Sequence, residues 1–140
     1  MTPEQQGPAG GITAHLTIRD NRAAEAIDFY AKAFGAEELG RHMADDGKRI
    51  MHAHLKLNGG SLMLNDDFPE FGSGAASPPA SVTLHLQVKD ADAAWNRALE
   101  AGAKERFPIG DQFWGDRYGQ VTDPFGFTWS IGAPLAPPVD

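Results

Sequence analysis

One segment of this chain occurs twice, with conservative changes between the copies. Residues 13–24 read T-A-H-L-T-I-R-D-N-R-A-A, and residues 83–94 read T-L-H-L-Q-V-K-D-A-D-A-A. Such a repeat constrains the fold more than any local pattern, because a repeated segment indicates a repeated supersecondary unit. We interpret the chain as a duplicated module. His15 and His85 then occupy equivalent positions, where the two copies can build one shared site.

Length and composition narrow the class of protein. Each half of the 140 residues would be marginally stable alone, so we expect the halves to share a core or a sheet. The absence of cysteine excludes disulfides, thiolate chemistry and Cys-based zinc sites. A net charge of -7 argues against a nucleic-acid partner. The sequence shows neither a membrane span nor a secretory signal, which predicts a cytoplasmic protein.

The first copy of the repeat predicts a strand followed by a helix. Residues 1–11 are polar and rich in Gly and Pro, so we expect a loose lead-in. Residues 13–18 alternate between polar and apolar side chains, as a half-buried strand does. The next apolar residues recur at helical spacing; Asp20 or Asn21 would cap this helix and Gly35 would end it.

The remaining pattern extends each copy to a β-α-β-β(-β) module. In the first half, alternation predicts two more strands, at 49–57 and 61–65, joined by the turn 58–60. In the second half, we expect a strand at 82–88 and a helix from Asp90 to Gly102. Two further strands, at 120–122 and 127–131, should follow, joined by the turn 123–126. The predicted organisation is one α+β domain with a first module at 12–66, a linker at 67–81 and a second module at 82–132.

Eight segments carry a resemblance to a known family: 12–16 (ITAHL), 26–30 (AIDFY), 34–36 (FGA), 51–55 (MHAHL), 62–66 (LMLND), 82–86 (VTLHL), 111–117 (DQFWGDR) and 123–126 (DPFG). With these segments, the chain resembles the vicinal oxygen chelate superfamily, the glyoxalase/bleomycin resistance/extradiol dioxygenase fold, and most of all its PhnB-like branch. The likeness covers about residues 12–132. It implies two tandem βαβββ modules that form a curled mixed sheet around a cavity.

The resemblance also implies where a metal would bind. The enzymes of this superfamily hold a divalent ion with residues from the first and last strands of each module. Aligned on the strand ends, the first-strand positions fall at Thr13 and Thr83, and His15 and His85 lie two residues further on. Aligned on 29–30 (FY), His15 itself takes the first position. Both registers remain open.

The last-strand positions of the resemblance fall near Met63 and at Ser130, where the metalloenzymes usually carry Glu. Without a carboxylate there, we expect the standard metal quartet to be missing and do not expect glyoxalase I activity. The favoured interpretation is that the two first-strand histidines line the cavity. The alternative is a divalent metal (Fe, Mn, Ni or Zn) on these histidines, completed by water or by His52 and His54. An exposed polar strand face is the other interpretation of His52 and His54.

Seven of the thirteen aromatic residues lie in one stretch of the second half. Small-molecule pockets are mostly apolar and aromatic with a few polar groups. Trp114, Tyr118 and Trp129 are therefore candidates for the cavity lining, with core packing as the alternative. Arg117 is a candidate for gripping a carboxylate or phosphate, or else for an ion pair with Asp116 that fixes the loop.

These observations predict a glyoxalase/dioxygenase-like protein that acts on or binds a small organic metabolite. The expected site is a cavity between the modules, roofed by residues 111–118. His15 and His85 are its candidate catalytic groups. Two alternatives stay open: a metal-free sequestration protein of the bleomycin-resistance type, and a metal-dependent lyase or dioxygenase. The resemblance favours a homodimer with a small-molecule ligand.

Overall fold

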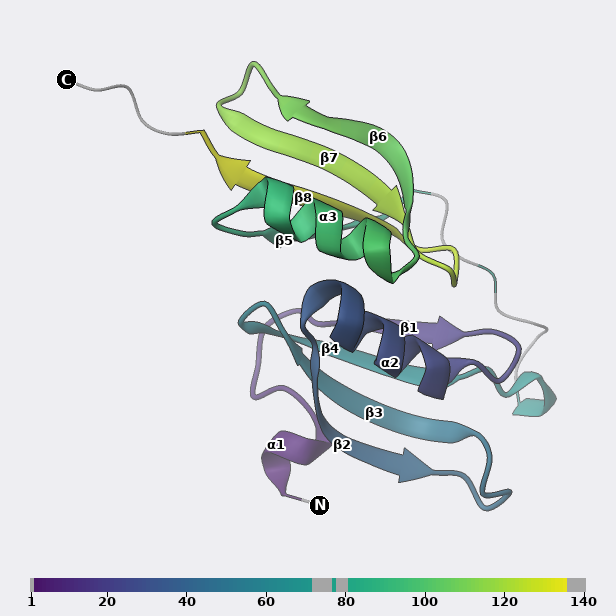
Figure 1. Cartoon of the computed structure of the whole chain (residues 1–140). Coiled ribbons are helices and arrows are strands. Elements are labelled where there is room, and N and C mark those ends of the chain that lie inside the picture. Colours follow the sequence, from purple (N-terminus) through teal and green to yellow (C-terminus); the bar gives the residue numbers. More distant parts are fainter. Residues whose placement is uncertain (1, 72–76, 78–80, 136–140) are drawn as a thin grey trace. The chain divides into compact units, whose positions relative to one another are not determined.

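The computed structural model of the chain describes residues 2–71, 77 and 81–135 (Figure 1). The chain divides into two compact units: Met1–Ala31 with Gly35–Ser77, and Lys32–Phe34 with Pro78–Asp140. Among the described residues, none of the helices combines the length and the apolarity that a membrane crossing requires. Part of the linker predicted at 67–81 lies outside the described residues; its described start contains the 3-10 turn η1 (Pro69–Phe71).

The first module is a four-stranded mixed sheet with one helix. Its strand order is β1 (Ala14–Ile18), β4 (Gly60–Asp66), β3 (Ile50–Leu57) and β2 (Glu37–Met43). β1 is parallel to β4, and the other neighbours are antiparallel. The helix α2 (Ala23–Phe34) connects β1 to β2 and lies along one face of the sheet (Figure 1).

The second module repeats this arrangement. Its strand order is β5 (Thr83–Gln87), β8 (Thr128–Pro134), β7 (Asp116–Thr122) and β6 (Lys104–Asp111), with β5 parallel to β8. The helix α3 (Ala91–Ala101) connects β5 to β6. The prediction of two βαβββ modules in an α+β fold is confirmed. The strands form two separate four-stranded sheets, neither of which is strongly curled (Figure 1).

Both helices end at the predicted glycine, and α3 also begins as predicted, whereas α2 does not. Gly35 closes α2 with the left-handed φ of 73°, and Asp90 caps α3 by accepting from the backbone N–H of Ala93. The prediction that Asp20 or Asn21 caps α2 is wrong. Both residues have a left-handed φ, 62° and 59°, outside the helix, and the N-cap position is held by an arginine without a side-chain cap.

Residues 3–6 are folded and hydrogen-bonded to the first sheet, which corrects the expectation of a loose lead-in for this part of the segment. They form the short helix α1 (Pro3–Gln6). In its capping box, the Gln5 backbone N–H donates to the Thr2 hydroxyl, and the Thr2 backbone N–H donates to the Gln5 side chain. The strands β2 and β6 were not predicted. Both are edge strands in which most side chains are exposed, so they lack the hydrophobic alternation that indicates a strand.

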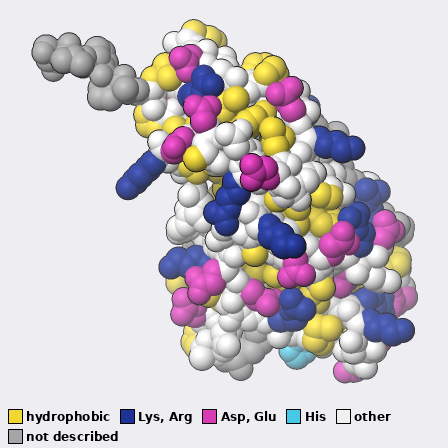
Figure 2. All heavy atoms as spheres, viewed as in Figure 1, with side chains coloured by type: hydrophobic (Ala, Val, Ile, Leu, Met, Phe, Trp, Pro, Cys, Tyr) yellow, Lys and Arg dark blue, Asp and Glu magenta, His cyan; other side chains and the backbone are white. Residues whose placement is uncertain are grey.

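The core of each module lies between its sheet and its helix. In β3, Ala53 and Leu55 are fully buried and alternate with His52 and His54, which point to the helix-free face. In β8, the buried Trp129 likewise alternates with residues of the helix-free face. Figure 2 shows acidic, basic and apolar side chains interspersed over the visible surface, so charge of one sign does not dominate that view. The helix-free faces carry most of the polar residues that the repeat singled out.

Candidate functional site

The strand register brings His15 and Met63 side by side on the helix-free face of the first module. His15 in β1 is paired with Met63 in β4, Met63 with His54 in β3, and His54 with Gly40 in β2. His15 itself is exposed. Thr13 lies just before β1 on the same side.

The second module has the equivalent row. His85 in β5 is paired with Ser130 in β8, Ser130 with Gln120 in β7, and Gln120 with Phe107 in β6. Each first-strand histidine thus lies beside the last-strand residue that the resemblance placed at a ligand position. Thr83 begins β5 and is exposed.

Hydrogen bonds and close packing hold His85 in one orientation. Its Nδ1 lies 2.6 Å from the Ser130 hydroxyl and its Nε2 2.7 Å from Oε1 of Gln87. Because an amide oxygen only accepts, Nε2 carries the hydrogen and Nδ1 accepts from Ser130. The ring stacks on Tyr118 with centroids 5.9 Å apart. Gly132 leaves room for it, since a Cβ at this position would lie 2.9 Å from Cε1 of the imidazole.

Aromatic rings extend this face beyond His85. Around Tyr118, Trp114 lies at 5.4 Å and Phe107 at 6.4 Å between ring centroids, both edge to face. The Tyr118 hydroxyl accepts from Nε2 of Gln120. Trp114 and Phe107 are 47% and 44% exposed, which leaves large apolar surfaces open to solvent. We call Phe107, Trp114, Tyr118 and His85 the aromatic platform.

Two of the residues predicted for the cavity lie elsewhere in the second module. Arg117 donates from Nε to Asp92 of α3 and from Nη1 to Asp111, and these two hydrogen bonds raise its pKa. It thereby ties β7 to α3 and to the end of β6, whereas the ion pair with Asp116 is not formed. Trp129 is buried, and its Nε1 donates to Asp123 Oδ2 at 2.8 Å. Its indole belongs to the core side of β8.

In the first module, the N-terminal segment covers His52 and His54. His54 donates from Nδ1 to the backbone oxygen of Glu4 and lies 2.9 Å through Nε2 from the Ser61 hydroxyl. His52 is hydrogen-bonded through Nε2 to the backbone oxygen of Gln6. His54 is 2% exposed, so this cover removes it from solvent. Both histidines therefore anchor α1 on the sheet of the first module.

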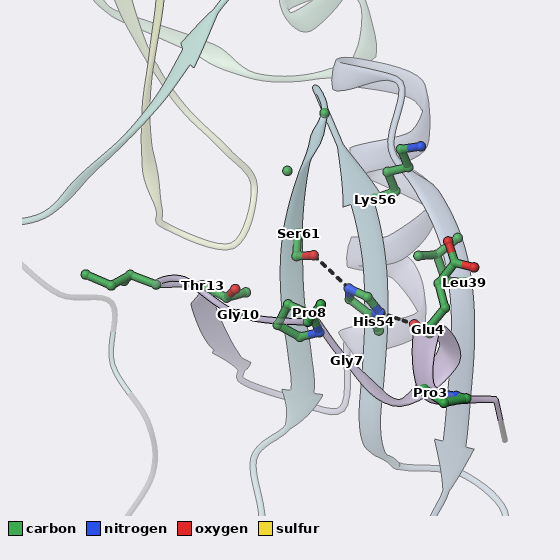
Figure 3. A pocket seen from close by; sticks show the side chains of 14 residues that line it. Pro3, Glu4, Gly7, Pro8, Gly10, Thr13, Leu39, His54, Lys56 and Ser61 are labelled. Carbon is green, nitrogen blue, oxygen red and sulfur yellow. Dashed lines mark hydrogen bonds between the residues drawn. The ribbon is translucent and has the colours of Figure 1, made fainter.

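A pocket of about 600 Å³ lies between this N-terminal segment and the strands β2–β4 (Figure 3). Its volume is in the range of small-molecule sites. Thr13, His54 and Ser61 line it, together with residues of the N-terminal segment. Sequence reasoning missed the contribution of that segment. The Thr2-x-x-Gln5 capping box was the signal that could have indicated a helix there.

The donor set does not fit the metal that the resemblance implies. Among the described residues, no cluster of three or more His, Asp or Glu side chains could hold an ion. A thioether at Met63 and a hydroxyl at Ser130 stand where the metalloenzymes carry carboxylates, and both are poor ligands for the hard divalent ions. Both ring nitrogens of His85 are also engaged in hydrogen bonds.

Comparisons with known proteins agree with this fold. The chain is 51% identical to uncharacterized protein Mb0911c of Mycobacterium bovis, in an alignment that covers 89% of this chain and 83% of the relative. Protein YjdN of Escherichia coli is 26% identical, with 86% and 92% covered.

Two solved structures extend the comparison. The structure of TioX from Micromonospora sp. ML1 matches with a TM-score of 0.68 and 27% identity, over 89% of this chain and 100% of that one. The PhnB protein from Bacillus cereus matches with a TM-score of 0.71 at 19% identity, over 89% and 99%, and shows the fold alone. Residues 12–131, nearly the whole chain, match one family. The chain belongs to the Glyoxalase/Bleomycin resistance protein/Dioxygenase superfamily.

Proposed function

We propose that this protein binds a small aromatic molecule on the aromatic platform of its second module, and that this binding needs no metal ion. The observation that carries the proposal is the set of rings around His85. Trp114 and Phe107 expose nearly half of their surface, and Tyr118 lies between them and the imidazole. Aromatic side chains favour offset-stacked or edge-to-face contacts with another ring.

The polar groups beside the rings support a specific site. The exposed amide of Gln87 is hydrogen-bonded to His85 and can give way to a ligand, so that Nε2–H donates to a ligand oxygen. Arg106 donates to the side chain of Gln120, next to the Tyr118 hydroxyl, and brings a positive charge to this edge. A flat ring with one or two oxygen substituents matches this combination.

The test is ligand-observed NMR and calorimetry with naphthalene-2-carboxylate and quinoline as probes, on protein treated with EDTA. We expect Trp114→Ala and Tyr118→Ala each to weaken binding roughly three- to tenfold, which is the range for an aromatic contact. Phe71→Ala is the matched control, because Phe71 is 84% exposed and lies in the first module, not among the rings of the platform. Binding that EDTA abolishes and a divalent metal restores would overturn the metal-free part. Binding that neither platform variant weakens would overturn the site.

Acid–base chemistry by His85 is a second candidate for the same face. Ser130 and Gln87 fix the tautomer of His85, as partners do for histidines that move protons. We expect His85→Gln to abolish any turnover of a bound compound. His15→Gln, at the equivalent position of the first module, should leave that turnover unchanged.

We also propose that the protein forms a homodimer. Each four-stranded sheet ends in edge strands, and a sheet edge can pair with another chain. Sedimentation velocity at two protein concentrations tests it, and a purely monomeric species at both would refute it.

A further inference from the structure

The N-terminal segment builds a pocket of its own in the first module, apart from the aromatic platform. We propose that this pocket binds a small zwitterionic molecule with an apolar body, whose carboxylate pairs with Lys56 and whose ammonium group pairs with Glu4. Both charged residues line the pocket, Glu4 from α1 and Lys56 from β3 (Figure 3). The proposal rests on the first module alone and does not depend on the proposed function.

The N-terminal wall is held in place by specific contacts. Hydrogen bonds from His52 and His54 to the backbone oxygens of Gln6 and Glu4 anchor α1 on the sheet. Gly40 in β2 allows the close approach, since a Cβ there would lie 2.7 Å from the Cβ and backbone oxygen of Gln5. The wall is therefore part of the folded module, and the pocket is preformed.

The two charges in the lining are available to a ligand. Among the described residues, neither Lys56 nor Glu4 makes an ion pair, with the other or with a third residue. Ser61 is paired with Lys56 in the β3–β4 ladder, and its hydroxyl is engaged with Nε2 of His54. The Lys56 ammonium suits a carboxylate, and the Glu4 carboxylate suits a cation.

The rest of the lining is apolar. Pro8, Ile12 and Leu39 contribute hydrocarbon surface. Ile12 is fully exposed, at 105% of its reference area, although it lines a pocket. Its side chain therefore offers apolar surface to a ligand rather than to the core of the module. Lysine and glutamate at the polar part, with this apolar surface beside them, match an amino acid or a short peptide with an apolar side chain.

The experiment uses the full chain and four probes that share one ring. L-Phenylalanine carries both charges, 3-phenylpropionate carries the acid alone, and 2-phenylethylamine carries the amine alone. The dipeptide Gly-Phe separates the two charges by one residue and so distinguishes an amino acid from a peptide. Saturation-transfer NMR gives the affinities. We expect one of the two zwitterions to bind at least tenfold more tightly than the acid or the amine.

Variants assign the charges to the residues. Lys56→Met should reduce the affinity for the zwitterion about tenfold and leave the affinity for 2-phenylethylamine unchanged. Glu4→Gln should also reduce the affinity for the zwitterion about tenfold, and it should leave the affinity for 3-phenylpropionate unchanged. Lys48→Met and Asp28→Asn are the controls, because both residues are exposed in the same module and do not line the pocket. All four changes lie at exposed positions, and thermal unfolding should confirm that the fold is kept.

Two results would overturn the proposal. The first is equal binding of all four probes, and the second is zwitterion binding that neither Lys56→Met nor Glu4→Gln weakens. Trp114→Ala in the second module separates this site from the aromatic platform. It should leave zwitterion binding unchanged, whether or not the platform binds a ligand.

Discussion

Asp66, at the end of β4, accepts a hydrogen bond from the backbone N–H of Ala23 at the start of α2, across 2.8 Å. Its other carboxylate oxygen accepts from the backbone N–H of Ile50 at 2.7 Å. The side chain is 1% exposed. One buried carboxylate thus joins the end of β4 and the start of β3 to the first turn of α2. It replaces the local side-chain cap that this helix lacks.

Replacement of Asp66 by alanine should therefore destabilise the first module. The change leaves the backbone N–H groups of Ala23 and Ile50 buried without an acceptor, and we expect a loss of about 3 kcal/mol in the free energy of unfolding. Urea unfolding measures it. Asp28→Ala, at an exposed position of α2, is the control and should change stability by less than about 0.5 kcal/mol. Equal midpoints for the two variants would show that the carboxylate does not hold the helix.

The repeat allowed the two modules and the paired positions of His15 and His85 to be predicted, because duplication preserves strand register. The cap of α2 could not be found in the same way. Asp66 is distant from Ala23 in sequence, and Asp20 and Asn21 offered a local alternative that has the wrong backbone conformation. Side-chain caps are readable from sequence only when they are local, as at Asp90.

The candidate site could be predicted only in part, because some of its contacts join residues that are distant in sequence. Strand alternation placed His52 and His54 on one face correctly. It could not indicate that the backbone of α1 covers them, since that contact depends on Gly40 and on distant parts of the chain. Alternation also gave no means to decide whether Trp129 faces the core, because this needs the register of β8 against β7.

The Asp46 carboxylate should make the stability of the fold depend on pH. Its carboxylate accepts from the backbone N–H groups of Arg49 and Lys48 and from the Arg49 guanidinium, which lowers its pKa from 3.8 to about 2. A pKa that is lower in the folded state stabilises the fold above about pH 3.8, and this stabilisation is lost as the pH falls through about 2. The stability difference between the wild type and Asp46→Asn should therefore shrink by most of its size between pH 4 and pH 2.

Carboxyl-detected NMR titration and urea unfolding at several pH values measure this effect. Asp45→Asn is the control, because the Asp45 carboxylate takes no part in the hydrogen bonds to Arg49. A difference between the wild type and Asp46→Asn that stays constant down to pH 2 would contradict the assignment.

Gly40 should control the position of the N-terminal segment. In Gly40→Ala the new Cβ would lie 2.7 Å from the backbone oxygen of Gln5, so α1 has to move away from the sheet. We expect faster hydrogen exchange at the amides of Gln6 and Gly7, which are bonded within α1, with little change in the global unfolding midpoint. Gly10→Ala is the control, since a Cβ at Gly10 meets open space. Unchanged exchange in Gly40→Ala would show that α1 is not seated against β2.

Gly132 should determine the orientation of His85. In Gly132→Ala the added Cβ would lie 2.9 Å from Cε1 of His85, and the imidazole, at the end of a side chain, can move where the strands cannot. The variant should keep its fold, lose the hydrogen bond between His85 and Ser130 at a cost of about 1 kcal/mol, and give up the stack on Tyr118. Imidazole-nitrogen NMR should show one tautomer, protonated at Nε2, in the wild type and a mixture in the variant. Gly110→Ala on the same sheet is the control, because its Cβ would lie 3.8 Å from the nearest atom. A single Nε2–H tautomer in Gly132→Ala would mean that Ser130 and Gln87 orient the ring without help from the glycine.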